Sequence, residues 1–291
     1  IYVKDDDDTF YGAINLKDLI VARGYTDLDS LISHSYPYVR DHESITDCIE
    51  QLKDYAEDSI PVLDDDNKLL GVITAQDIVE VVDDEMGDDY AKLAGMTEEA
   101  DLEESLPESI KKRLPWLVVL LGLSLCVSTV TGLFENVISH LAIIVSFQSL
   151  ILGMSGNVGT QSLAVTIRVL MDEDLSGRQK WELIFKEARI GFCNGLMLGL
   201  LAFAFIGTYV YVLKGRPLQY AFSVSACAGV ALMLAMTISS VVGTVVPMFF
   251  HKVKVDPAVA SGPLISTVND FVAVVTYYGL AWVLLIHVLH L

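Results

Sequence analysis

The chain has 291 residues, 53% of them hydrophobic, and a formal net charge of −19 at pH 7. The charge is uneven, because residues 1–108 hold 30 acidic and 7 basic side chains, whereas residues 109–291 hold 8 and 12. An acidic half repels nucleic acid and attracts cations, so the composition argues against a nucleic-acid partner and predicts a soluble acidic part followed by an apolar part.

An internal repeat occupies the acidic half. The run V-K-D-D-D-D-T-F-Y-G-A-I-N-L-K-D-L-I from Val3 aligns without gaps with V-L-D-D-D-N-K-L-L-G-V-I-T-A-Q-D-I-V from Val62. Each run is typical of a strand, an acidic turn, a second strand and a helix, with Asn15 or Thr74 at the helix N-cap. Residues 44–55 between the runs have helical periodicity.

This order of strands and helices resembles a CBS domain. Residues 36–89 resemble a second copy, and residues 1–35 resemble the C-terminal part of a first copy, as expected for a piece of a longer protein. The resemblance implies paired domains that often bind adenosine nucleotides such as ATP, with Thr74 and Asp77 in a T-x-x-D motif at the ribose. A simple helix-capping pair is the alternative for these two residues.

The last helix of the second copy continues as an acidic run. Helical spacing places Asp77, Glu80, Asp84 and Asp88 near one face of this helix. Like charges three or four residues apart are destabilising, and a divalent cation such as Mg2+ would compensate them. A solvated helix end whose charges repel each other is the alternative.

Five apolar runs follow a connecting segment. Residues 90–113 predict an amphipathic helix or a pair of helices. The apolar runs lie within 114–291 and are long enough to cross a bilayer. They cover residues 115–134, 137–169, 190–213, 217–250 and 257–290. The fold class expected is therefore a cytosolic α/β CBS region, a connecting helix and an all-α membrane domain of five transmembrane helices, in contact with lipid.

The orientation in the membrane follows from the basic residues. Lysine and arginine are concentrated in the segments on the side of the acidic half. The positive-inside rule then predicts a cytoplasmic N-terminal half and an extracellular or periplasmic C-terminus.

A polar constellation interrupts two of the apolar runs. Asp270 is the only Asp, Glu, Lys or Arg of the last run, and an unpaired charge in a membrane costs several kcal/mol, so it indicates function. The second run carries three glycines and five polar residues between Gly153 and Ser162. The side-chain oxygens of Asn157 and Gln161 can coordinate water around an ion. Alternatives are a protonated packing aspartate and a helix-dimerisation motif for the glycines.

Two-fold symmetry offers a cation site. It would bring two copies of Asp270 to one axis, and two carboxylates with several waters suit a hydrated Mg2+.

The runs G-M-S-G-N-x-G-x-Q-S and V-D-P-A-x-x-x-x-P-L-x-x-T-x-x-D, together with the CBS repeat, resemble the MgtE family of magnesium transporters. The resemblance implies a homodimer with a connecting plug helix and a pore lined by the second and fifth membrane helices. It places the pore ion at Asp270, with a backbone carbonyl from Ser266. It also assigns cytosolic Mg2+-sensing positions to Asp77, Glu80, Glu85, Asp88, Asp89 and Asp256.

Together these features predict Mg2+ transport through a homodimeric, channel-like pore in the cell membrane, closed by cytosolic Mg2+ on acidic CBS and plug surfaces. One alternative is a broader divalent cation transporter that also carries Mn2+, Co2+ or Zn2+. Another is a nucleotide-sensing CBS protein that the apolar half only anchors. The sequence has no Ser/His/Asp arrangement, phosphate-binding loop or HExxH motif, so we expect no enzyme.

Overall fold

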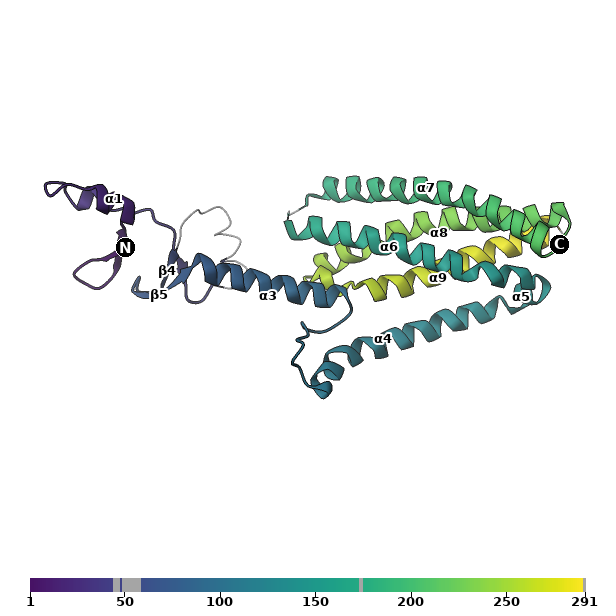
Figure 1. The fold of residues 1–291 in the computed structure, drawn as a ribbon, viewed down its shortest axis with the longest axis horizontal. Helices are drawn as coiled ribbons and strands as arrows, with labels where there is room; N and C mark the ends of the chain where they lie inside the picture. The colour runs from purple at the N-terminus through teal and green to yellow at the C-terminus, as the bar shows by residue number, and fades with distance from the viewer. Residues whose placement is uncertain (44–47, 49–58, 173–174, 290–291) are drawn as a thin grey trace. The chain divides into compact units, whose positions relative to one another are not determined.

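The computed structural model describes residues 1–43, 48, 59–172 and 175–289. Its contacts divide the chain into two compact units, Ile1–Gly87 and Asp88–Leu291. Figure 1 shows the elements of both units in chain order. The helix predicted over residues 44–55 lies outside the described residues, apart from Cys48.

The first unit consists of two hairpins, each followed by a helix. Its elements are β1 (Tyr2–Lys4), β2 (Phe10–Ala13), α1 (Leu16–Val21), η1 (Asp29–Leu31), β3 (Val39–Arg40), β4 (Ser59–Leu63), β5 (Leu69–Thr74) and most of α3 (Ala75–Leu93). β1 pairs with β2 and β4 with β5, both antiparallel, while β3 lies parallel to β4. The strand–turn–strand–helix order predicted for both runs is confirmed.

The two hairpin turns repeat each other residue by residue. Asp8 and Asn67, which are equivalent in the repeat, both adopt positive φ, at 65° and 61°. Asp5 and Asp64, also equivalent, each accept two backbone N–H groups of their own turn. Aspartate side chains stabilise turns in this way, and Asn and Asp tolerate the left-handed conformation. The acidic residues at these positions are therefore explained by turn geometry.

The second unit contains the long helices. They are α4 (Leu106–Leu133), α5 (Glu135–His140), α6 (Val145–Asp172), α7 (Gly177–Thr208), α8 (Leu218–Lys252) and α9 (Gly262–Ala281). Five segments are long and apolar enough to cross a membrane, namely Leu106–Leu133, Ala142–Leu170, Gly177–Leu213, Leu218–Lys252 and Gly262–Val288. The prediction of five membrane-spanning helices is confirmed.

The prediction for the connecting segment is wrong in its helix boundaries. Residues 94–105 contain no helix, and α4 begins at Leu106 and continues without a break into the first membrane span. Ser105 and Glu108 form a capping box at this start, with the Ser105 N–H 3.1 Å from Glu108 Oε2. This local start signal outweighs the apolar stripe seen in the sequence.

The third span also begins earlier than predicted, at Gly177 instead of residue 190. Ser176 and Gln179 form its capping box. The first turns of α7 carry charged residues, so their mean hydropathy is too low to indicate a membrane helix.

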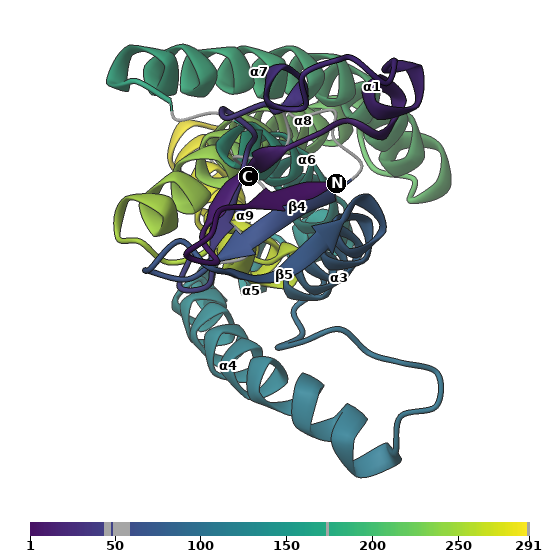
Figure 2. The same cartoon turned by 90° about the vertical axis from the view of Figure 1, so that its left-hand side faces the viewer.

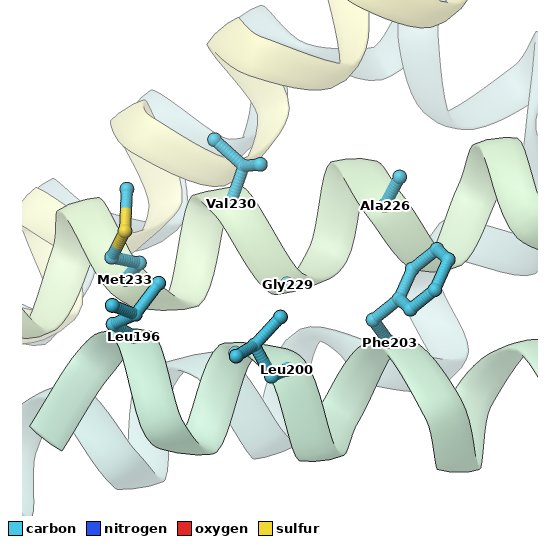
Figure 3. Close-up of a pocket in the computed structure, with 8 residues that line it drawn as sticks. Leu196, Leu200, Phe203, Ala226, Gly229, Val230 and Met233 are labelled. Atoms are coloured by element: carbon cyan, nitrogen blue, oxygen red, sulfur yellow. The ribbon is translucent and has the colours of Figure 1, made fainter.

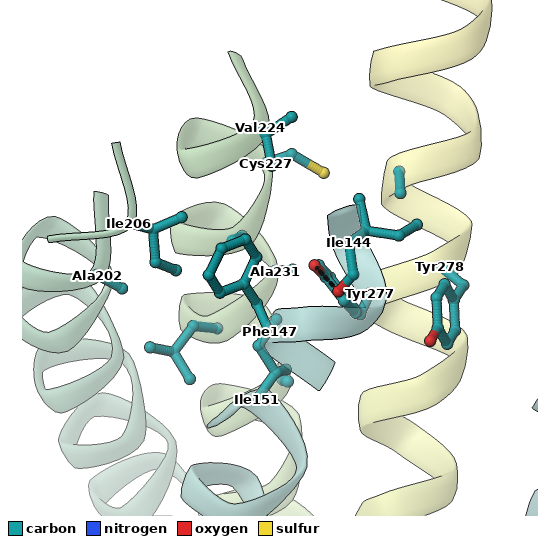
Figure 4. Packing of buried hydrophobic residues seen from close by; sticks show 14 of the residues in the cluster. Ile144, Phe147, Ile151, Ala202, Ile206, Val224, Cys227, Ala231, Tyr277 and Tyr278 are labelled. Atoms are coloured by element: carbon teal, nitrogen blue, oxygen red, sulfur yellow. Dashed lines mark hydrogen bonds between the residues drawn. The ribbon is translucent and has the colours of Figure 1, made fainter. Parts of the chain in front are cut away.

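Helices α6, α7, α8 and α9 pack together, whereas α4 contacts mainly α9 and has no buried residue. Figures 1 and 2 show α4 leaning away from the other four helices. The apolar core gathers around Tyr277 and Tyr278 of α9 (Figure 4). Tyr277 Oη donates to Ile144 O at 2.8 Å and Tyr278 Oη to Gln148 Oε1 at 2.7 Å. Both rings thus bury their apolar bodies with their hydroxyls satisfied.

Helices α7 and α8 approach closely where glycines face each other. A Cβ on Gly199 would lie 2.6 Å from the backbone oxygen of Gly229. Beside this contact runs a groove of about 270 Å³. Figure 3 shows its apolar lining of Leu196, Leu200, Phe203, Ala226, Val230 and Met233. The groove offers no side-chain ligand for an ion, so it is not a candidate ion site.

Candidate functional site in the membrane helices and the acidic segment

The membrane site is built on the contact between α6 and α9. A Cβ on Gly156 would lie 2.8 Å from Ser266 Oγ, and a Cβ on Gly159 would overlap the side-chain amide of Asn269. Two glycines on one face of α6 therefore let α9 approach to within backbone distance. This contact places Ser266 against the helical turn that carries Asn157.

One face of α6, which carries two carboxamide side chains, is left uncovered. Gly153, Asn157, Gln161 and Ala164 are all exposed, at spacings that put them on one face of the helix. Carboxamide groups facing hydrocarbon would leave their donors and acceptors unpaired, which is unfavourable. In the membrane this face requires water or a second protein surface.

Asp270 lies on α9 one residue beyond Asn269 and is partly buried. Among the described residues, no hydrogen bond or ion pair reaches its carboxylate, and none joins it to Asn157 or Gln161. Asn269 is fully buried, and neither its Oδ1 nor its Nδ2 has a partner in the described structure. The structure thus holds an unpaired carboxylate at the level of the glycine contacts.

The predicted acids of α3 are divided between the two units. Asp77, Glu80 and Asp84 belong to the first unit and are exposed, and the side chain of Glu85 is outside the described part. Asp77 Oδ2 accepts from Thr74 N–H at 2.8 Å and from Thr74 Oγ1 at 2.7 Å. These two bonds lower the pKa of Asp77 below its usual value, and the bond from the backbone N–H of Thr74 is the larger cause. The capping interpretation of this pair is confirmed.

Asp77 also lines a pocket of about 300 Å³ in the first unit. The other lining residues include Val39, Arg40, Asp41, Val62, Ile73 and Val81. Thr74 is not among them. The guanidinium of Arg40 donates to Asp64 O at 2.7 Å and to Asn67 Oδ1 at 2.9 Å. The pocket is therefore lined by the carboxylates of Asp41 and Asp77 and by Arg40, whose guanidinium is already hydrogen-bonded within the protein.

The remaining predicted acids meet a lysine in the second unit. Lys92 Nζ lies 2.8 Å from Asp256 Oδ2 and 3.7 Å from Asp89 Oδ1. Hydrogen bonding to Asp256 is the main cause that raises the pKa of Lys92. Asp88 Oδ1 accepts from the Glu99 N–H at 3.1 Å. Lys92 carries no signal in the sequence, because its partner Asp256 lies 164 positions away along the chain.

Apolar contacts also join the end of α3 to the start of α9. Leu93 packs in a cluster with Leu163 of α6 and Ile265 of α9. A Cβ on Gly95, whose φ is +83°, would lie 3.3 Å from Pro263 Cγ. The last residues of the acidic helix therefore rest directly on the helix that carries Asp270.

Within the described ranges, no group of three or more His, Cys, Asp or Glu side chains is close enough to hold a metal ion. Within one described chain, the predicted acidic residues therefore do not form a single cluster. Mg2+ retains several waters and often takes only one or two carboxylates, so scattered acids still fit a hydrated or shared ion.

Comparison with known proteins identifies two regions. Residues 148–280 match the MgtE family model, described as a divalent cation transporter, and residues 28–84 match the CBS domain. Curated relatives named magnesium transporter MgtE come from Enterococcus faecalis, Bacillus subtilis and Thermus thermophilus. Their identities to this chain are 35%, 32% and 31%, over 97%, 97% and 98% of its length. The chain spans 60%, 60% and 62% of those proteins.

Proposed function

Because the chain belongs to the MgtE family, we propose that it transports Mg2+ across the cell membrane through a pore made by two copies. The N-terminal half lies in the cytoplasm, and Mg2+ there closes the pore by binding acidic surfaces of the CBS region and the segment after it. The positive-inside distribution of lysine and arginine supports this orientation.

One observation carries the proposal. An uncovered polar face on α6, with Asn157 and Gln161, accompanies an unpaired Asp270 on the adjoining α9. A second copy related by a two-fold axis would cover that face, double the carboxylates and leave a water-filled path. Carboxylate and amide oxygens around a hydrated ion suit Mg2+, which loses its waters reluctantly.

Transport is tested with the full-length protein in liposomes that contain a Mg2+-sensitive dye. We expect Mg2+ influx that depends on the protein and on the outward-to-inward gradient. Mn2+, Co2+ and Zn2+ as competitors separate a Mg2+-selective pore from a broader divalent cation transporter. Protein-free liposomes are the control, and no influx above that control contradicts the proposal.

Gating is proposed to use the acids that Lys92 now bridges. The ammonium of Lys92 lies where Asp89 and Asp256 approach each other, so it neutralises the charge that would attract a divalent cation. Mg2+ binding at these acids has to compete with this tethered cation.

Limited proteolysis tests the gating proposal. We expect millimolar Mg2+ to protect residues 80–113, and Asp88→Asn with Asp89→Asn to remove that protection. Lys92→Gln removes the competing cation and should shift half-protection to an at least about threefold lower Mg2+ concentration, because the freed carboxylates attract Mg2+. Lys17→Gln, an exposed lysine of the first unit, is the matched control. Equal half-protection concentrations for Lys92→Gln and the parent contradict the role given to Lys92.

A second candidate function is nucleotide binding in the pocket lined by Asp77. Calorimetry of the full chain with ATP, with and without Mg2+, measures it directly. We expect Asp77→Asn to weaken ATP binding by ~10-fold or more, since a carboxylate that accepts two ribose hydroxyls contributes about 1–3 kcal/mol. Asp84→Asn, on an exposed part of the same helix, should leave ATP binding unchanged. No heat of binding with the parent excludes this second function.

A further inference from the structure

A buried carboxyl group lies where three membrane helices meet, away from the proposed pore face. Glu187 of α7 is only 4% exposed, and it meets Ser162 of α6 and Ser240 of α8, which are 2% and 0% exposed. Ser162 Oγ lies 2.9 Å from Glu187 Oε2, the two serine hydroxyls lie 2.7 Å apart, and Ser240 Oγ lies 2.7 Å from the backbone oxygen of Glu187. Three short oxygen–oxygen contacts thus connect three helices.

Counting hydrogens fixes the protonation state of this cluster. Each short contact needs one hydrogen, and the hydroxyls of Ser162 and Ser240 supply two. The backbone oxygen of Glu187 supplies none. With an ionised carboxylate, one of the three contacts would bring two acceptors together at less than 3 Å. With a neutral acid, Glu187 donates to Ser162, Ser162 to Ser240, and Ser240 to the Glu187 backbone oxygen.

Charge balance leads to the same state. Within the described part of the chain, no Lys, Arg or His lies at ion-pair distance from Glu187, and its basic neighbours along α7, Lys186 and Arg189, are exposed. A buried ionised carboxylate without a cationic partner costs several kcal/mol, and the third hydrogen that the three contacts require removes that uncompensated charge.

Close packing of α7 against α8 continues beside this cluster. Gly191, one turn along α7, faces the same serine, and a Cβ there would lie 2.6 Å from Ser240 Cβ and 3.0 Å from Met236 O. Helices α7 and α8 are thus in direct contact beside Glu187. The three oxygen–oxygen contacts are all hydrogen bonds only if a third hydrogen is present.

We infer that Glu187 is a proton-binding site of the membrane domain, and that the neutral acid positions α6 by locking it to α7 and α8 through Ser162 and Ser240. Ser162 directly follows Gln161, so this lock sets the rotation of the exposed polar face of α6. Glu187 is a positioning residue for that face and does not itself meet the ion.

Infrared spectroscopy of the full chain in lipid tests the proton directly. Glu187→Gln should lose the carbonyl stretch of a protonated carboxylic acid, so this band should appear in the difference spectrum of parent minus variant. Glu182→Gln removes an exposed carboxylate paired with Arg178 on the same helix, so it should instead lose an ionised carboxylate band. Loss of an ionised band in Glu187→Gln overturns the inference. This readout does not depend on Mg2+ transport, so it separates failure of the inference from failure of the proposed function.

The positioning role has its own pair of variants. The amide of glutamine can donate to Ser162 as the neutral acid does, so Glu187→Gln should lower Tm by less than half the change seen with Glu187→Ala. We expect Glu187→Ala to lower Tm by ~5 °C or more, because Ser162 loses the carboxyl group that bonds it to α7 and a buried side chain is removed. If both variants lower Tm equally, the side chain fills space and does not hold the helices through hydrogen bonds, which contradicts the lock.

Discussion

Replacing Asp270 with asparagine is expected to lower the Mg2+ flux through liposomes by at least about tenfold. The substitution keeps the shape of the side chain and removes its charge. A tenfold change in ion binding corresponds to about 1.4 kcal/mol, which is less than a carboxylate contributes to holding a divalent cation in a site of reduced dielectric. Because the carboxylate has no partner in the described structure, the variant leaves no cation uncompensated and should fold normally.

The measurement is Mg2+ influx at equal amounts of reconstituted protein. Glu182→Gln, an exposed carboxylate at the start of α7, is the charge-matched control and should conduct like the parent. Ser266→Ala should have a smaller effect than Asp270→Asn, because the proposed ligand at that position is a backbone carbonyl. If Asp270→Asn carries Mg2+ as fast as the parent, Asp270 is not in the ion path.

Replacing Gly159 with alanine is expected to destabilise the membrane domain more than any other glycine substitution on α6. The added methyl group would overlap the Asn269 amide, and it would lie 3.2 Å from the backbone oxygen of Ser239. Opposite it, a Cβ on Gly243 would overlap the Gly159 carbonyl. Overpacking of this kind costs about 1–3 kcal/mol, and here it forces apart three helices whose backbones already touch.

Gly153→Ala is the matched control, since it lies on the same helix with nothing within 4 Å of its Cβ position. An exposed glycine in a helix costs roughly 0.5–1 kcal/mol relative to alanine, so this variant should be as stable as the parent or more stable. Thermal unfolding in detergent, followed by near-UV circular dichroism, compares the two. If Gly159→Ala and Gly153→Ala unfold at the same temperature, the close contact of α6 with α8 and α9 is not required.

Several features of the fold could be predicted because the signal is local. The acidic repeat specifies two equivalent hairpins, since Asp5 and Asp64 stabilise their turns through bonds within four residues. Membrane spans are visible because roughly 20 apolar residues in sequence are needed to cross a bilayer. The predicted helix boundaries were wrong where a capping residue starts the helix well before its apolar run, as at Ser105 and Ser176.

Other features of the candidate site need contacts between distant segments. Lys92 and Asp256 are 164 residues apart, and Ser162 and Ser240 are 78 apart. Glu187 gave no signal, because it lies in charged turns that a hydropathy scan assigns to a loop. Helical periodicity gives the face on which a residue lies, but it does not say which helix covers that face.

The resemblance to MgtE transporters, the division into an acidic and an apolar part, the five apolar spans and the isolated charge of Asp270 can all be seen in the sequence alone. These depend on composition, motifs and local periodicity, which one chain carries along its length. Which distant polar groups satisfy each other depends on the fold, which brings Lys92 to Asp256 and Ser162 to the Glu187 carboxyl. Whether a charge in a protein is a ligand or a structural bond depends on the donors that folding brings to it, and those donors come from elsewhere in the chain.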